Sequence, residues 1–302
     1  MVAPPSLPSD IVVLERGWLS SNNTLLLSEQ SCALVDSGYC THAHQTLALV
    51  RHALGGKLLG VLANTHLHSD HCGGNAALQA AYPGLRTLIP PGQSAQVRDW
   101  DPVALSYVPT GQHCPQFRMD AVLLPGSEIS MGQRMWQVHG APGHDPHSVI
   151  LFEPGLRVLI SADALWENGF GVVFQELEGG QAFEDVSATL DLIESLAPQL
   201  VIPGHGPVFS GVDAALANAR RRLESFCREP TKHATHAAKV LVKFKLLEQQ
   251  RMPIDQLVRW AASTSYFELV RRRWFAHLAL EAWVLQLAEN LVQSVTLGVG
   301  QF

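Results

Sequence analysis

Charged residues are scarce in this chain: they make up 16% of its 302 residues, whereas about a quarter is usual in globular proteins. Hydrophobic residues reach 47%, which excludes a disordered chain, because disordered chains are rich in charge and poor in apolar residues. Long apolar runs are also lacking, since none approaches the ~18–20 residues of a transmembrane helix. The first residues have neither the basic start nor the apolar core of a signal peptide. We therefore expect a cytoplasmic protein without a membrane partner.

Cysteine is sparse and unpatterned. The five cysteines are odd in number, and no two of them have the CxxC spacing. We expect free thiols in a reducing compartment, and neither structural disulfides nor a thiolate zinc site.

Charge and composition change along the chain. Residues 1–210 contain 8 Lys and Arg against 19 Asp and Glu, a balance of −11, while residues 211–302 contain 13 against 8, a balance of +5. Glycine and proline become rare after about residue 209. The length by itself favours about two domains. These changes predict one domain at 1–210 and a second, mostly helical domain at 211–302.

Short apolar runs alternate with helical periods in the first domain. Strands are predicted at 11–14, 24–27, 33–35, 58–63, 136–139, 149–152, 158–160 and 199–202, and a helix is predicted at 181–196. The alternation predicts an α/β fold in which helices cover the sheets. Helical periods in the second domain run through 212–227, 232–250, 253–262 and 264–293.

The strongest local motif directly follows the predicted buried strand at 58–63. It reads Thr-His-Leu-His-Ser-Asp-His over residues 65–71, with three imidazoles and one carboxylate within six residues. Imidazole and carboxylate suit divalent zinc, iron or manganese. In an extended backbone His66 and His68 can point into one space, and Asp70 and His71 can then face a second metal. A histidine-rich surface loop is disfavoured, because such a loop would not emerge from a buried strand.

Four further pieces follow strand-like runs or short turns. They are Asp36 in Leu-Val-Asp-Ser-Gly, His144 in Pro-Gly-His, Asp163 in Ser-Ala-Asp-Ala and His205 in Pro-Gly-His-Gly. Each piece is weak by itself. Residues at the ends of successive strands converge on one edge of a sheet, where binding sites are usually built.

With the 65–71 motif and the four pieces in this order, the chain resembles the metallo-β-lactamase-fold hydrolases over roughly residues 10–210. The resemblance implies a four-layer αβ/βα sandwich as the catalytic domain, with a helical, winged-helix-like appendage at 211–302. It also implies two divalent metal ions as cofactors, with zinc favoured and iron or manganese as alternatives.

The resemblance further implies a role for each residue. One ion would be held by His66, His68 and His144, and the other by Asp70, His71 and His205. Asp163 would bridge both ions, and Asp36 would orient the ligand loop. Two such ions generate hydroxide from a shared water at neutral pH. Asp70 and Asp163 would act in catalysis by offsetting the metal charge and orienting that water.

Departures from the pattern narrow the activity. Exported β-lactamases lack a bridging carboxylate such as Asp163, and flavodiiron proteins carry a glutamate where His68 stands. Glyoxalase II enzymes carry a Gly-Cys-Gly glutathione-binding stretch after the bridging aspartate, and residues 165–171 here read Leu-Trp-Glu-Asn-Gly-Phe-Gly. Glutathione thioesters therefore lose support. Four residues of this stretch are predicted to line the substrate cleft: Trp166, Glu167, Asn168 and Phe170. His147 replaces a family glycine, and we favour an inward-facing ring over a place at the site.

The favoured activity is hydrolysis of a small acyl ester or thioester. One alternative is a phosphodiesterase or single-strand endoribonuclease. The +5 balance after residue 210 favours it, and the −11 balance before that residue opposes it, so a nucleic-acid partner is disfavoured. A persulfide dioxygenase with a single iron and a non-catalytic regulatory protein are further alternatives. Family members with helical tails often pair, which hints at a homodimer.

Two groups of basic residues in the second domain are expected to lie on the protein surface. His233 and His236 lie in a basic helical segment and are expected to face solvent. The three consecutive arginines at 271–273 fan out around a helix and are expected to form a solvated face.

Overall fold

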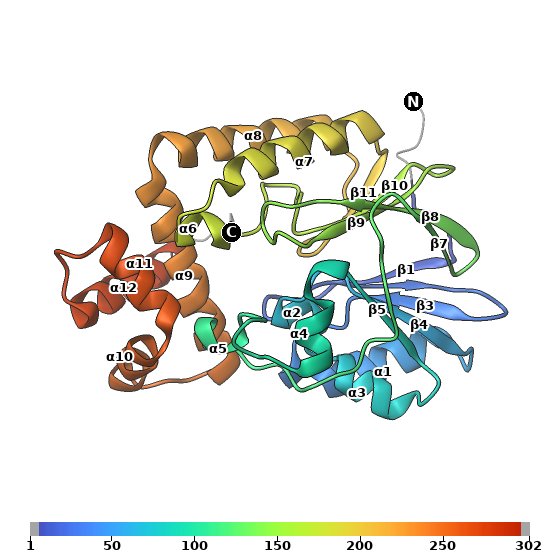
Figure 1. The fold of residues 1–302 in the computed structure, drawn as a ribbon, viewed down its shortest axis with the longest axis horizontal. Coiled ribbons are helices and arrows are strands. Elements are labelled where there is room, and N and C mark those ends of the chain that lie inside the picture. The colour runs from blue at the N-terminus through green and yellow to red at the C-terminus, as the bar shows by residue number, and fades with distance from the viewer. Residues whose placement is uncertain (1–5, 297–302) are drawn as a thin grey trace.

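Two facing β-sheets form the centre of the protein in the computed structural model, which describes residues 6–296 (Figure 1). The first sheet has the strand order β1-β2-β3-β4-β5-β6. Its strands are β1 (Ile11–Leu14), β2 (Asn23–Leu26), β3 (Cys32–Val35), β4 (Leu59–Ala63), β5 (Arg86–Ile89) and β6 (Ala121–Val122). The second sheet has the order β11-β10-β9-β8-β7. Its strands are β7 (Glu128–Met131), β8 (Arg134–Gly140), β9 (Val149–Glu153), β10 (Val158–Ala162) and β11 (Leu200–Pro203).

Helices cover the outer face of each sheet. The helices of this region are α1 (Ala43–Leu54), α2 (Ser69–Cys72), α3 (Asn75–Ala81), α4 (Ser94–Asp99), α5 (Tyr107–Thr110), α6 (Phe174–Glu178) and α7 (Ala182–Leu196). Short 3₁₀ turns occur at Cys40–His42 and Pro91–Gln93. Helices α1 and α3 lie under the first sheet, and α7 and α8 (Val212–Arg228) lie over the second (Figure 1). The predicted four-layer αβ/βα sandwich is confirmed.

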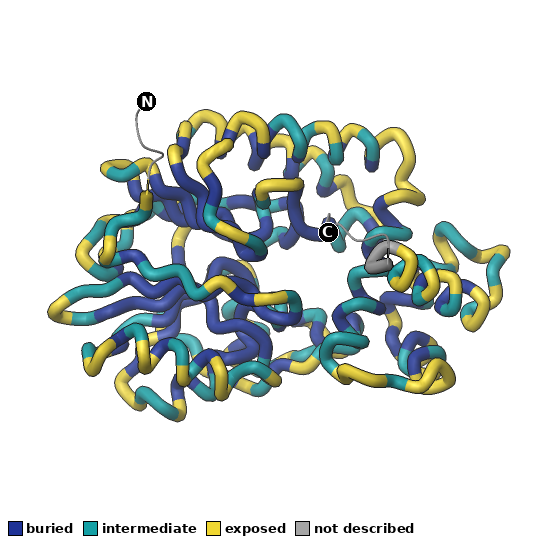
Figure 2. Tube along the Cα trace, turned by 180° about the vertical axis from the view of Figure 1, so that it is seen from behind, coloured by how far each residue is buried: buried dark blue, intermediate teal, exposed yellow. Residues whose placement is uncertain are grey.

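Three hydrophobic cores hold the four layers together. The core between the sheets contains Trp136, which is fully buried. A second core joins the first sheet to α1 and α3 through residues such as Leu62 and Leu78. The third joins the second sheet to α7 and α8 through residues such as Leu190 and Leu216. Burial is accordingly concentrated in the strands, while the outer faces of the helices are exposed (Figure 2). Burial of this apolar surface is the main favourable term for the fold.

Parallel pairing brings several loops to one edge of the sandwich. In the first sheet β3 pairs in parallel with β4, and in the second β10 pairs in parallel with β11. Within each sheet, the segments after the two parallel strands therefore leave in the same direction. They carry Asp36, the 65–71 motif, Asp163 and His205, and the β8–β9 loop adds His144.

The C-terminal part is helical, as predicted. After α8 come α9 (Pro230–Gln249), α10 (Ile254–Ser263), α11 (Ser265–Trp274) and α12 (Leu280–Thr296). Helix α8 packs its apolar face into the core of the second sheet, whereas α9 to α12 share a core of their own. The division at residue 210 stays a prediction. None of the helices in residues 6–296 is long and apolar enough to cross a membrane.

The prediction of one helix over 264–293 is wrong. The segment forms α11 and α12, separated by a turn in which the Leu278 N–H donates to the Phe275 carbonyl at 2.9 Å. No glycine or proline marks the break in the sequence. Aromatic packing explains the turn, because it lets Trp283 of α12 lie against Phe275 at 5.0 Å and Phe267 at 5.7 Å between ring centroids.

The expectation that His233 and His236 face solvent is also wrong. His233 is 1% exposed, and its Nε2 accepts the backbone N–H of Val173 at 3.1 Å. His236 is half-buried, and its Nε2 accepts a hydrogen bond from Arg222 Nη2 at 2.7 Å. Burial is the largest cause that lowers the pKa of His233 to about 4 and that of His236 to about 3, so both imidazoles are neutral at pH 7. Helix α9 turns this face inward, toward the sandwich.

Candidate metal centre

Seven side chains converge where the loops meet, and they form two groups of metal-binding donors. The first group is His66, His68 and His144, and the second is Asp70, His71, Asp163 and His205. Within each group the donor atoms all lie within 4.8 Å of one another. These seven residues are called the metal-ligand cluster below. The structure thus brings together every residue to which the sequence assigns a metal ion.

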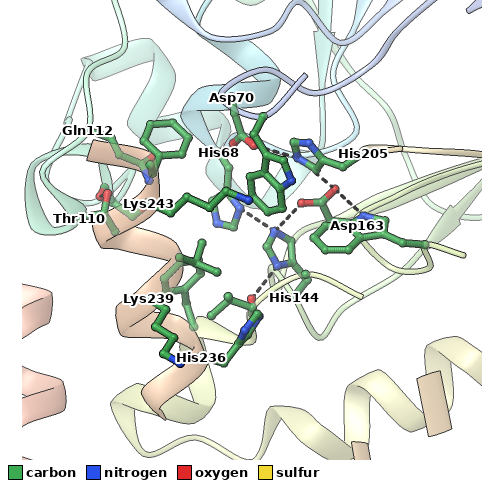
Figure 3. Close-up of a pocket in the computed structure, with 18 of the residues that line it drawn as sticks. His68, Asp70, Thr110, Gln112, His144, Asp163, His205, His236, Lys239 and Lys243 are labelled. Atoms are coloured by element: carbon green, nitrogen blue, oxygen red, sulfur yellow. Dashed lines mark hydrogen bonds and ion pairs between the residues drawn. The ribbon is translucent and has the colours of Figure 1, made fainter. Parts of the chain in front are cut away.

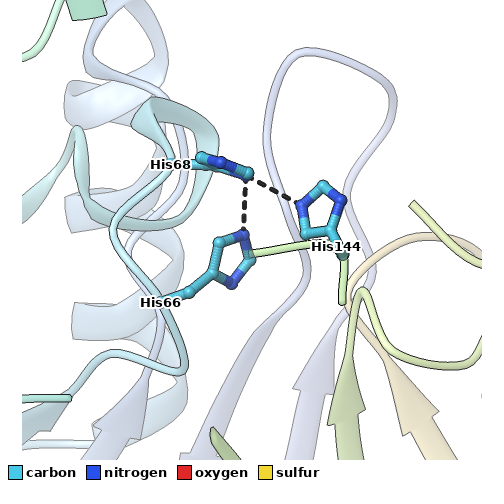
Figure 4. A group of neighbouring side chains, drawn as sticks. All are labelled: His66, His68 and His144. Atoms are coloured by element: carbon cyan, nitrogen blue, oxygen red, sulfur yellow. Dashed lines mark hydrogen bonds between the residues drawn. The ribbon is translucent and has the colours of Figure 1, made fainter. Parts of the chain in front are cut away.

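The first group directs three imidazole nitrogens at one point (Figure 4). The distance from His68 Nδ1 is 2.8 Å to His144 Nε2 and 3.1 Å to His66 Nε2. His144 donates its Nδ1–H to the Val172 carbonyl at 2.6 Å, so its Nε2 faces the group as a lone pair. Burial lowers the pKa of His66 well below its usual range and that of His144 to about 4. Three converging imidazole nitrogens fit a bound cation, because a cation replaces lone-pair repulsion by coordination.

The second group contains an unsatisfied buried nitrogen. His71 is fully buried, and its Nε2 has no hydrogen-bond partner in the part of the chain that the structure describes. The nearest carboxylate oxygen, Oδ1 of Asp163, is 3.4 Å away. Opposite His71, Nε2 of His205 lies 3.1 Å from Oδ2 of Asp70. One further imidazole and two carboxylates around such a nitrogen fit a second divalent cation.

Asp163 lies between the two groups. Its Oδ1 faces His71 at 3.4 Å and His205 at 3.8 Å, and its Oδ2 faces His144 at 3.3 Å. Burial opposes ionisation of Asp163, but the imidazoles of His71 and His205 outweigh it and lower the pKa of the carboxyl well below its usual range. The indole N–H of Trp166 donates to Oδ1 at 3.1 Å and fixes its orientation.

Asp36 holds the motif loop from behind. Its Oδ2 accepts the Nδ1–H of His71 at 2.8 Å and the Thr65 hydroxyl at 2.8 Å, and its Oδ1 accepts the Thr65 backbone N–H at 2.9 Å. These bonds fix the tautomer of His71, so that Nε2 faces the cluster. Asp36 adopts a left-handed backbone with φ +58°, a conformation that aspartate tolerates better than most residues. The position predicted for Asp36 beside the ligand loop agrees with this geometry.

Two glycines let backbone approach the cluster. A Cβ added to Gly204 would lie 2.1 Å from Oδ1 of Asp163, and one added to Gly171 would lie 2.4 Å from Nδ1 of His144. The Pro-Gly-His-Gly piece around His205 is therefore a close-approach site as well as a turn.

A cavity of about 280 Å³ opens onto the cluster. One side of it is formed by His68, Asp70, His144, Asp163 and His205 (Figure 3). Aromatic side chains of Trp18, Trp166, Phe174 and Phe244 also line it. Trp18 stacks on His205 with 5.1 Å between ring centroids and an interplanar angle of 12°. The volume is close to the lower end of the ~300–1,000 Å³ typical of small-molecule sites.

Only one of the four residues predicted to line the cleft does so. Trp166 lines the cavity, whereas Glu167 and Asn168 are exposed and lie outside its lining. The backbone N–H of Trp166 donates to the Gly169 carbonyl at 2.6 Å, and this tight turn directs residues 167 and 168 outward. Phe170 is 1% exposed and packs in the core beneath α7 and α8. The aromatic side chain there serves packing instead of binding.

His147 faces the protein and not the cluster, as expected. Its ring packs against the loop at Gly92, where an added Cβ would lie 2.1 Å from Nδ1 of His147.

Asp145, two residues before His147, is a functional candidate that no motif in the sequence marks. It is buried, and its Oδ2 lies 3.8 Å from Nε2 of His68.

Helix α9 provides the facing side of the cavity. Its lining residues are His236, Lys239, Val240, Lys243 and Phe244, called the α9 wall below. No motif in the sequence marks this wall. The residues have the helical i, i+3/i+4 spacing of a single face, but only the docking of α9 shows that this face looks onto the cluster.

Comparisons with known proteins agree with this architecture. The model of the metallo-beta-lactamase superfamily matches residues 16–205. A hydroxyacylglutathione hydrolase of Anaeromyxobacter dehalogenans is 29% identical over 74% of this chain and 76% of its own length. Another, from Brucella anthropi, is 24% identical over 68% of this chain, and the match spans 66% of that protein.

Solved structures show the same fold. A metallo-beta-lactamase family protein from Thermus thermophilus has a TM-score of 0.57 at 19% identity, with 96% of this chain and 95% of that chain covered. The protein TTHA1623, solved in a di-iron-bound form, has a TM-score of 0.52 at 25% identity over 69% of this chain and 98% of its own. The first likeness includes the helical C-terminal region, and the second does not extend over the whole chain.

Proposed function

The chain belongs to the metallo-beta-lactamase superfamily, and on this premise we propose that it is a dinuclear metal-dependent hydrolase of small acyl thioesters or esters. The observation that carries the proposal is the position of Asp163, whose two oxygens face the two groups of donors from one carboxylate. The hydroxyacylglutathione hydrolases among the relatives support the thioester class. The residues at 165–171 keep glutathione itself outside the proposal.

Each residue of the cluster has a role in this proposal. His66, His68 and His144 would hold one divalent ion, Asp70, His71 and His205 the other, and Asp163 both. Bound there, the two ions supply a hydroxide at neutral pH and polarise the oxygen under attack. Zinc suits this donor set, and iron or manganese suits it as well.

The chain's own groups prepare the site for that chemistry. Asp36 fixes the direction of His71, and the Val172 carbonyl fixes that of His144. Trp166 holds Oδ1 of Asp163 by its indole N–H. Trp18, Phe174 and Phe244 supply an apolar surface for the acyl arm and exclude bulk water from it. The attack needs no serine or cysteine nucleophile.

A turnover assay tests the proposal. Metal-loaded protein is given a short acyl thioester, and metal content is measured in parallel. We expect two metal equivalents and thioester cleavage, with kcat/KM at least about 100-fold lower in Asp163→Asn. Asp120→Asn is the matched control, because Asp120 accepts the Thr87 backbone N–H at 2.7 Å and has no place in the cluster. Inertness toward both the thioester and the corresponding ester, with two bound metals, would contradict the proposal.

A second candidate function, single-strand endoribonuclease, is favoured by one observation: two lysines of α9 line the cavity. The same assay with single-stranded RNA separates the two. RNA cleavage that is lost in Asp163→Asn, without thioester cleavage, would identify the nuclease. A single bound iron with neither cleavage would point to the persulfide dioxygenase.

A further inference from the structure

The α9 wall is cationic where it meets the cavity. Lys239 and Lys243 are one helical turn apart on the same face, and both line the cavity that opens onto the cluster (Figure 3). Among the described residues that line it, the only carboxylates are Asp70 and Asp163, which belong to the metal-ligand cluster. The cavity therefore has its carboxylates on the cluster side and its lysines on the wall side.

Lys243 is held in place at the inner part of this wall. Its Nζ lies 4.1 Å from the ring centroid of Trp18, and the same indole stacks on His205 of the cluster. Trp18 thus connects an ammonium group to a proposed metal ligand through one aromatic ring. Burial lowers the pKa of Lys243 to about 8, so the side chain is still mostly protonated at pH 7.

Lys239 and His236 form the outer part of the wall. Lys239 has no ion-pair partner within residues 6–296, and it lines a second pocket along the first half of α9 as well as the cavity. His236 accepts from Arg222 at Nε2, so its Nδ1 carries the proton and can donate a hydrogen bond. This end of the cavity thus offers a cation and a neutral donor.

The rest of the lining includes aromatic and aliphatic side chains. Phe174, Val240 and Phe244 line the cavity, and none of them can satisfy a charge. A ligand that fills the cavity therefore meets the metal-ligand cluster, an apolar surface and the two lysines.

From this arrangement we infer that the substrate carries a compact anionic group, a carboxylate or a phosphate, which Lys239 and Lys243 bind while the scissile acyl bond lies at the metal-ligand cluster. The inference rests on the proposed function for the scissile bond, and it adds the class of substrate and the residues that select it. Lysines bind such a group as point charges and do not require a planar partner. The cavity volume of about 280 Å³ suits one small anion on a short apolar arm.

A binding experiment tests the inference without turnover. Three thioethers that lack a thioester or carboxylic ester bond are titrated calorimetrically into the metal-loaded protein: 3-(butylthio)propionate, 2-(butylthio)ethyl phosphate and 3-(butylthio)propanamide. We expect at least one of the two anions to bind about tenfold more tightly than the amide. The anion that binds more tightly identifies the head group.

Variants test whether the anionic group is bound by the α9 wall or by the metal ions. In Lys239→Gln/Lys243→Gln the preference for the anion should fall below about threefold, and Lys243→Arg, which keeps the charge, should retain most of it. Lys232→Gln is the matched control, because Lys232 lies on the exposed side of α9 and pairs with Glu229 at 2.8 Å. Circular dichroism melting checks that each variant is folded.

The outcomes are distinguishable from those of the turnover assay. Equal binding of anions and amide by the wild type, or a preference that survives in the double variant, would overturn the inference even if thioesters are cleaved. A lysine-dependent preference without thioester cleavage would uphold the anion site and refute the proposed function. Tight lysine-dependent binding of single-stranded RNA, with neither small anion bound, would also overturn it.

Discussion

All seven side chains of the metal-ligand cluster come from the two-sheet region, whereas the helical region supplies the facing wall of the same cavity. The first set stands directly after strand ends, and backbone hydrogen bonds of the sheets fix where those ends lie. The second set stands on a helix that is positioned by side-chain packing and a few polar contacts. On the proposed function, the reaction and the choice of substrate would be carried by separate parts of the molecule.

The largest expected effect concerns Asp36, which acts only within the two-sheet region. Asp36→Asn keeps the size and the tolerance for a left-handed backbone but removes the charge that faces His71 Nδ1. We expect the affinity for the second metal equivalent to fall about 10–100-fold, with the first equivalent unaffected. Stepwise metal titration followed by elemental analysis measures this.

Asp120→Asn again serves as the control for that titration, since its carboxylate also accepts a backbone N–H in the first sheet. The anion preference of the α9 wall should be unchanged in Asp36→Asn. Equal loss of both metal equivalents would show that Asp36 supports the whole cluster and not His71 alone.

A smaller effect concerns His233, which lies at the junction of the two regions. Burial lowers its pKa from about 6.5 in the unfolded chain to about 4 in the folded protein, and its Nε2 accepts the Val173 N–H. The stability from this neutral histidine is fully present above about pH 6.5 and is lost as the pH falls toward 4. From pH 7 to pH 5 we expect its share of the unfolding free energy to fall by about 2 kcal/mol.

Urea unfolding at the two pH values measures this share. In His233→Gln the decrease between pH 7 and pH 5 should be smaller by about 2 kcal/mol. His44→Gln is the control for a histidine substitution, because His44 is exposed on α1. An unchanged pH dependence in His233→Gln would show that His233 is not the source of the stability lost between pH 7 and pH 5.

The smallest effect concerns the polar contact between α9 and the first sheet. Tyr39 is fully buried, and its hydroxyl donates to Oε1 of Glu248 at 2.5 Å and accepts the His113 N–H at 3.2 Å. Tyr39→Phe should lower the unfolding free energy by about 1 kcal/mol, because two partners lose a hydrogen bond. In this variant turnover should change less than the anion preference, because the lost hydrogen bond positions the α9 wall and not the metal-ligand cluster.

Tyr82→Phe provides the matched comparison in the same denaturation experiment. The Tyr82 hydroxyl is buried without a hydrogen-bond partner in residues 6–296, so its removal should cost nothing measurable. A cost for Tyr82→Phe as large as that for Tyr39→Phe would attribute the effect to packing and not to the contact with Glu248.

The amino-acid pattern was enough to predict the strands and most helices of this chain. The apolar run before residue 65 indicated a buried strand. Helical periodicity similarly predicted α7, α8, α9 and α10 to within a few residues of their bounds. Local patterns were enough for these elements because the cause of each lies within the segment itself. That the ligand-type residues meet was implied by the resemblance of their order to a known family, and not by any single segment.

How the helical region is used depends on packing that no segment reveals by itself. Nothing local marks the break between α11 and α12, the burial of His233, or the side of α9 that faces the cluster. Phe170 and Glu167 show the same limit, since they are three residues apart and one lies in the core while the other lies at a turn in solvent. The physical reason is that a helix has several usable faces, and the choice among them depends on the surface against which it packs.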